Sequence, residues 1–152
     1  MSEWETVISF ESSEEPYEAW ACVFCCFEDR IWKLRNEFFR WLAKRFGMEH
    51  LDPITIAGGP MALAEDDPMR KEFALNEIRI SRKAHHTNRV ILIFHTDCGA
   101  YKEMGKIFSS CEDEYHHHEA ASLRAEAVII ERYPGMEVER YIADFHGIHR
   151  IR

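Results

Sequence analysis

Three side chains that can bind a transition metal follow two apolar segments of this sequence. Cys26 ends the run Ala19–Cys26, AWACVFCC, while His95 and Cys98 come directly after the apolar residues Val90–Phe94. Two thiolates and one imidazole form the donor set of a catalytic zinc site, in which the fourth position is left for water. At such a site the metal lowers the pKa of bound water and makes hydroxide available near neutral pH.

Two charged side chains come shortly after Cys26. The segment Cys26–Arg30 reads CFEDR, and in an extended backbone every second side chain points the same way. Glu28 can accept a hydrogen bond from the hydroxide, and Arg30 can hold Glu28 away from the metal through a bidentate contact. We therefore expect Glu28 and Arg30 to be catalytic residues beside the metal ligands.

The apolar pattern predicts the elements that position these residues. Strands are expected at Glu5–Phe10, Ala19–Cys26, Pro53–Ala57, Val90–Phe94 and Glu137–Phe145, and helices at Ile31–Phe46, Pro68–Ala84, Gly99–Phe108 and Glu119–Arg132. This alternation indicates an α/β fold of three layers, with a mostly parallel sheet of about four strands flanked by helices. Ligand sites in such sheets lie beyond the carboxyl ends of the strands. With no repeat or linker in the sequence, we expect residues 1–152 to form a single domain.

The motifs resemble those of the β-class carbonic anhydrases, which carry Cys-x-Asp-x-Arg after one strand and His-x-x-Cys-Gly after a later one. Here these positions read Cys26, Glu28 and Arg30, then His95, Cys98 and Gly99. The segment Ile56–Gly59, IAGG, stands where the family has Asn-Ala-Gly-Asn. The resemblance implies a Zn²⁺-dependent lyase that reversibly hydrates carbon dioxide to bicarbonate by zinc-bound hydroxide. It also implies a β-carbonic-anhydrase-like sheet core and a homodimer or dimer-based oligomer.

Several positions depart from the family pattern. Glu28 replaces the aspartate, and its extra methylene can bring the carboxylate onto the metal. The predicted helix Ile31–Phe46 stands where most members have a loop, and the chain contains no glutamine to bind bicarbonate. Two alternatives therefore stay open. One is a related hydrolase of carbonyl sulfide or carbon disulfide, and the other is a non-catalytic zinc-binding protein in which Glu28 closes the metal site.

The remaining cysteines and the histidine tract have simpler interpretations. Cys22 and Cys25 suit a closed structural zinc site together with the later pair of ligands. However, residues three apart on a strand face opposite sides, so we expect both thiols in the core. Cys111 is expected in a loop. His116–His118 is expected in a solvated loop that runs into a helix, with metal binding or a proton-shuttle role as the alternatives.

The composition and net charge of the chain argue against some classes of binding partner. The net charge of −8 over 152 residues argues against a nucleic-acid or anionic-membrane surface. No apolar run approaches the roughly 20 residues of a membrane-spanning helix, and the N-terminal MSEWETVISFESSEEP lacks a signal peptide's basic and apolar regions. We therefore expect a cytoplasmic protein with reduced cysteines and a small-molecule substrate. Apolar side chains such as Phe38, Phe39 and Trp41 are expected at a homodimer interface.

Overall fold

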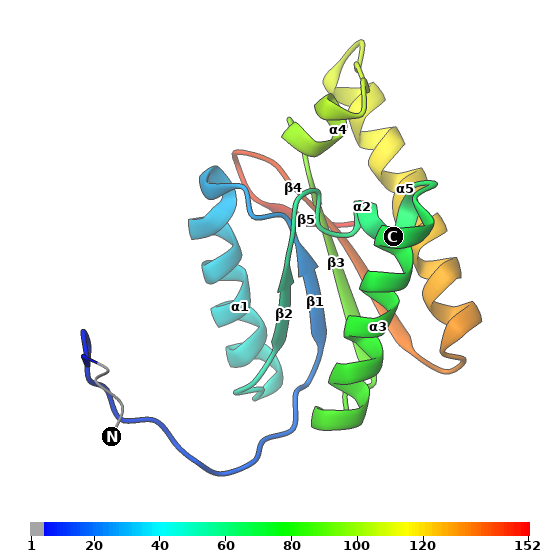
Figure 1. Ribbon diagram of the computed structural model, residues 1–152. Coiled ribbons are helices and arrows are strands. Elements are labelled where there is room, and N and C mark those ends of the chain that lie inside the picture. Colours follow the sequence, from blue (N-terminus) through cyan, green and yellow to red (C-terminus); the bar gives the residue numbers. More distant parts are fainter. Residues whose placement is uncertain (1–4) are drawn as a thin grey trace.

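The computed structural model describes residues 5–152, and its central feature is a five-stranded sheet with helices on both faces (Figure 1). The strands are β1 Cys22–Cys25, β2 Asp52–Thr55, β3 Arg89–His95, β4 Glu137–Ala143 and β5 Ile148–Arg150. They lie in the order β2-β1-β3-β4-β5; the first four are parallel and β5 is antiparallel to β4. The predicted mostly parallel sheet is confirmed, and the short strand β5 extends it at one edge.

One long helix covers one face of the sheet, and three helices cover the other. They are η1 Asp29–Ile31, α1 Trp32–Phe46, α2 Met61–Ala64, α3 Pro68–His85, α4 Gly99–Glu103 and α5 Cys111–Arg132. Helix α1 packs on one face, where Phe38 and Leu42 contact a cluster that includes Val23 and Ile91. Helices α2, α3 and α5 pack on the other face around Phe24 and other side chains of the central strands. The three-layer α/β architecture is therefore confirmed.

Local signals in the sequence set the ends of the long helices. Asp67 caps α3, because its Oδ1 accepts a hydrogen bond from the backbone N–H of Arg70 at 3.1 Å, and Pro68 fills the first position. Gly47 ends α1 in a left-handed conformation with φ +65°, which glycine adopts without strain. None of the helices in the described part of the chain is both long and apolar enough to cross a membrane.

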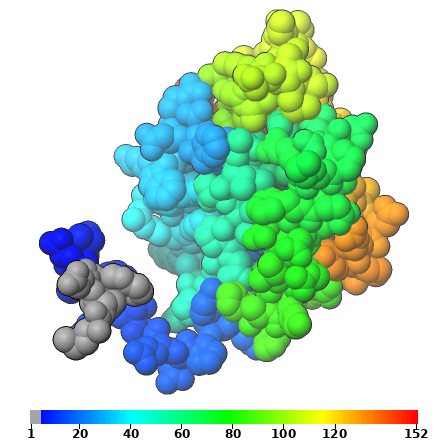
Figure 2. All heavy atoms as spheres, viewed as in Figure 1, coloured from blue at the N-terminus to red at the C-terminus, as the bar shows by residue number. Residues whose placement is uncertain are grey.

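Two predicted elements are absent or shorter. The strand predicted at Glu5–Phe10 is wrong, because these residues are exposed and pair with none of the five strands in residues 5–152. In Figure 2 this dark-blue segment stands away from the body of the protein. The helix predicted at Gly99–Phe108 ends at Glu103, since the chain turns at Gly105 with φ +79°.

The helix predicted at Glu119–Arg132 begins eight residues earlier, at Cys111. Ser110 caps it, because its hydroxyl oxygen accepts a hydrogen bond from the backbone N–H of Asp113 at 3.1 Å. Acidic residues in the first turn of α5 add a favourable interaction with the helix dipole. The loop positions predicted for Cys111 and His116–His118 are therefore wrong, and these residues lie in α5.

Candidate metal centre

The predicted metal ligands meet at the carboxyl ends of two neighbouring strands. Cys26 follows β1, His95 is the last residue of β3, and Cys98 is the residue that precedes α4. All three residues are buried, and one ligand atom from each lies within 4.8 Å of the other two. Tetrahedral zinc with two sulfur ligands and one nitrogen ligand places these atoms about 3.5–3.8 Å apart. Only small adjustments therefore separate this cluster from a zinc-binding geometry.

The hydrogen bonds of His95 leave one ring nitrogen available to a metal. Nδ1 lies 2.8 Å from the carbonyl oxygen of Thr96. Since a carbonyl oxygen can only accept, Nδ1 carries the proton and Nε2 has a free lone pair. Nε2 is buried and has no hydrogen-bond partner in the part of the chain that the structure describes. A buried acceptor without a partner is costly, so the residues present fit a metal ion at this point.

The two thiols of the cluster differ in acidity. A hydrogen bond from the Cys98 thiol lowers the pKa of Cys26 well below its ordinary range, and the backbone amides of Glu28 and Gly58 lower it further. The same hydrogen bond, together with burial, raises the pKa of Cys98. The metal-free pair therefore keeps one proton between two sulfurs. A metal that binds both thiolates must displace this proton, so metal affinity decreases in acid.

The glycine pair after β2 closes one side of the cluster. Gly58 donates its backbone N–H to the sulfur of Cys26 at 3.3 Å. At Gly59 the backbone has φ +52°, and a Cβ atom there would lie 2.7 Å from the backbone carbon of Cys25 and from the backbone nitrogen of Cys26. Only glycine allows this approach. The IAGG segment thus directly supports Cys26, the first of the predicted metal ligands.

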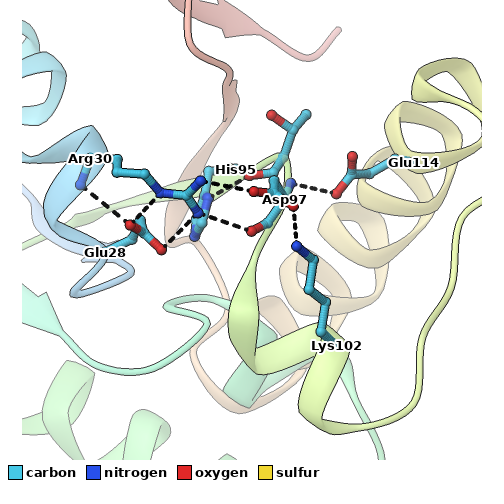
Figure 3. A network of polar contacts seen from close by, with 7 residues as sticks. Glu28, Arg30, His95, Asp97, Lys102 and Glu114 are labelled. Atoms are coloured by element: carbon cyan, nitrogen blue, oxygen red, sulfur yellow. Dashed lines mark hydrogen bonds and ion pairs between the residues drawn. The ribbon is translucent and has the colours of Figure 1, made fainter.

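Glu28 and Arg30 form the bidentate pair that the sequence predicts (Figure 3). Arg30 Nε donates to Glu28 Oε1 at 2.7 Å, Nη2 donates to Oε2 at 3.1 Å, and the backbone N–H of Arg30 donates to Oε1 at 3.3 Å. These hydrogen bonds lower the pKa of Glu28, which stays ionised at neutral pH. Both carboxylate oxygens are thus engaged by arginine, and Glu28 is not one of the three clustered donors.

Sequence reasoning missed three residues that extend this pair into a network. Nη1 of Arg30 donates to Oδ2 of Asp97 at 2.9 Å, and Lys102 forms an ion pair with Oδ1 of Asp97. The backbone N–H of Asp97 donates to Oε1 of Glu114 on α5 at 2.7 Å. Only Asp97 carried a signal in the sequence, since it stands between two predicted ligands. Glu114 lies in the segment that was predicted as a loop.

Comparisons with known proteins agree with the fold and the motifs. A family model described as "Putative carbonic anhydrase" matches residues 17–151. The chain belongs to the carbonic anhydrase family. Among solved structures, the carbonic anhydrase of Streptococcus mutans is similar with a TM-score of 0.56 and 14% identity, over 93% of this chain and 88% of that one. A β-carbonic anhydrase of Trichomonas vaginalis is similar with a TM-score of 0.55 and 11% identity, over 94% of this chain and 87% of that one. These similarities confirm the predicted β-carbonic-anhydrase-like fold.

This carbonic anhydrase family member is also similar to another solved structure and to one uncharacterized relative. A carbon disulfide hydrolase, solved in its apo form, has a TM-score of 0.53 and 14% identity, over 90% of this chain and 80% of that one. An uncharacterized protein of Rickettsia bellii is 25% identical over 111 residues, which cover 70% of this chain and 68% of the relative. The solved structures share the fold at low sequence identity. The function therefore has to be inferred from the residues of the site and not from the fold.

The other cysteines and histidines of this carbonic anhydrase family member lie outside the metal centre. Cys22 packs with the cluster under α3 and α5, whereas Cys25 packs with the cluster under α1. Cys22 and Cys25 face opposite sides of the sheet, so a structural zinc site that uses both thiols is excluded. Their predicted positions in the core are confirmed. His118 is fully buried in α5. Within residues 5–152, the only group of three or more clustered metal-type donors is the one at the ends of β1 and β3.

Proposed function

We propose that this protein is a zinc-dependent lyase that interconverts carbon dioxide and bicarbonate. The observation that carries the proposal is the buried, unpartnered Nε2 of His95 beside two thiols, because this donor set suits zinc with one position left open. When bound, zinc would lower the pKa of water and supply hydroxide near neutral pH. Membership of the carbonic anhydrase family supports the same reaction.

In this proposal Cys26, His95 and Cys98 hold the metal, and Glu28 and Arg30 are catalytic residues. Arg30 keeps Glu28 ionised and engages both of its carboxylate oxygens. The Glu28 side chain is 22% exposed, so its carboxylate borders the site without being sealed in the core. We expect it to accept a hydrogen bond from the reacting oxygen and to orient that oxygen toward the substrate.

A second candidate is hydrolysis of carbonyl sulfide or carbon disulfide by the same donor set. The similarity in fold to a carbon disulfide hydrolase favours keeping this candidate. The non-catalytic alternative requires Glu28 to leave Arg30 and close the metal shell. Three hydrogen bonds from Arg30 to Glu28 argue against that arrangement.

The first experiment measures metal content and stopped-flow hydration of carbon dioxide on the same preparations. We expect about one zinc per chain and hydration activity in the wild type, and the loss of both in Cys98→Ser. Cys111→Ser is the matched control, because Cys111 is exposed and lies outside the donor cluster; it should keep zinc and activity.

The other outcomes separate the candidates. Zinc without hydration activity, but with turnover of carbonyl sulfide or carbon disulfide, identifies the second candidate. Zinc binding with no turnover of any of the three substrates refutes both enzyme candidates. A wild type that binds no zinc in the presence of excess metal refutes the metal centre itself.

A homodimer, a cytoplasmic location and a single domain remain predictions. The face that carries α1 has an open groove of about 650 Å³ with several aromatic side chains in its lining. Trp41 in this groove is 45% exposed, so a second copy of the chain would bury apolar surface there. Sedimentation velocity at micromolar concentration tests this prediction, and a stable monomer would contradict it.

A further inference from the structure

We propose that Asp97 is a positioning residue that keeps Glu28 off the metal by acting through Arg30. The inference rests on the proposed function, because it concerns the same metal centre. Glu28 and Arg30 belong to the segment after β1, whereas Asp97 stands in the loop between the ligands His95 and Cys98. A single guanidinium joins these two segments (Figure 3).

The guanidinium of Arg30 lies between two carboxylates. Its Nε and Nη2 atoms hold Glu28 at 2.7 and 3.1 Å, and Nη1 donates to Oδ2 of Asp97 at 2.9 Å. Nη2 also lies 3.4 Å from the carbonyl oxygen of Asp97. Because a guanidinium is planar and rigid, contacts along two of its edges fix both its position and its orientation. Asp97 therefore determines where the Glu28–Arg30 pair lies relative to the donor cluster.

Asp97 is itself held from two helices. Its backbone has φ +57°, a left-handed conformation that aspartate tolerates better than most residues. Its N–H donates to Glu114 on α5, and its carboxylate pairs with Lys102 on α4. Lys102 and Arg30 together lower the pKa of Asp97, so the side chain stays charged. This anchoring distinguishes the contact from an isolated surface ion pair, which contributes little.

Arg30 has no comparable anchor apart from Asp97. Its side chain is 49% exposed, and in the described chain its hydrogen bonds go only to Glu28 and Asp97. Phe145 lies under the guanidinium at 5.1 Å, a contact that restrains the distance but not the direction of the hydrogen bonds. Without Asp97 the arginine can turn into solvent, and Glu28 is then free to approach the open position. Asp97 thus sets whether the fourth position is open or closed.

The test uses the protein with cobalt(II) in place of zinc, and the variant Asp97→Gly. Glycine adopts φ +57° and keeps the N–H that binds Glu114, so only the side chain is lost. Where water occupies the fourth position, its ionisation makes the visible cobalt spectrum change with pH. We expect this change in the wild type and its loss in Asp97→Gly, with cobalt content unchanged and activity of the zinc form reduced about 10- to 100-fold.

Two further variants make the result specific. In the double variant Asp97→Gly/Glu28→Gln the amide is a poor metal ligand, so the pH-dependent spectrum should return. Glu72→Gln is the matched control, because Glu72 forms an exposed bidentate pair with Arg132 that links α3 and α5 outside the metal centre; it should leave spectrum and activity unchanged. If Asp97→Gly does not fold, Asp97→Asn removes the charge with a residue that also suits left-handed backbone.

Three results would overturn the inference. They are a pH-dependent spectrum that persists in both Asp97 variants, a double variant that stays insensitive to pH, and a wild type that is itself insensitive. The cobalt spectrum needs no turnover, so it reports on Glu28 even if carbon dioxide is not the substrate. Failure of the wild type to bind cobalt or zinc would instead refute the proposed metal centre.

Discussion

His118 is a buried titratable group on α5 whose charge state should control acid stability. Its side chain is fully buried near the rings of Phe94, Tyr101 and Phe108, with centroids 5.7, 5.2 and 6.0 Å away. Neither ring nitrogen has a hydrogen-bond partner in the described chain, and the closest carboxylate oxygen, of Glu114, is 3.7 Å from Nε2. Burial lowers the pKa of His118 to about 3.

The sign and size of the effect follow from this pKa. An unfolded histidine takes up its proton near pH 6.5, whereas folded His118 stays neutral until the pH approaches 3. Below about pH 6.5 the unfolded state therefore binds the extra proton, and stability falls as the pH drops through this window. At about pH 5 the difference lowers the free energy of unfolding by about 2 kcal/mol relative to pH 8.

The measurement is urea unfolding of wild type and His118→Leu at pH 8 and pH 5. Leucine has a similar volume and no proton to gain, so the variant should lose about 2 kcal/mol less than the wild type on acidification. His116→Leu removes an exposed histidine of the same helix and should keep the wild-type loss. Each titration is repeated with a chelator, because release in acid of zinc from the proposed site would also destabilise the folded state. Equal losses in wild type and His118→Leu would refute the assignment of a buried neutral histidine.

Two other substitutions test the packing around the site. Gly59→Ala should lower the free energy of unfolding by about 2–4 kcal/mol and also lower zinc content, because the added Cβ meets the backbone of Cys25 and Cys26 at 2.7 Å; unchanged zinc content and stability would contradict the close approach. Leu42→Ala should cost about 2–5 kcal/mol in urea unfolding, since Leu42 is fully buried between α1 and the sheet, but zinc content should not change. A loss of zinc in the folded Leu42→Ala protein would show that α1 also shapes the metal centre.

The sheet and the clustering of the three donor side chains were predictable because their signals are local. The apolar run Val90–Phe94 is fully buried in β3, and the positions of His95 and Cys98 follow from its end. Parallel strands place their carboxyl ends together, so two short motifs were enough to predict one cluster. The pairing of Glu28 with Arg30 was also local, since the residues are two apart.

The errors come from contacts that the sequence does not display. The acidic start of α5 looked like a loop because its apolar periodicity is interrupted by His116–His118, although the Ser110 cap was present in the sequence. Strand β5 is three residues long, too short for a recognisable alternation. The link from Asp97 to Arg30 joins residues 67 positions apart. Only the folded sheet brings these side chains together.

The two neighbouring strands that carry the proposed ligands would couple metal binding to the assembly of the sheet. β1 and β3 are far apart in the sequence, and their register pairs Phe24 with Leu92. A slip of one residue would move His95 by about 3.3 Å along the strand and turn its ring toward the opposite face. Such a chain cannot bring three donors to one point. If the proposed site holds zinc, the metal would bind selectively to the correctly registered sheet, and a rising zinc concentration should remove mispaired forms from the folding population.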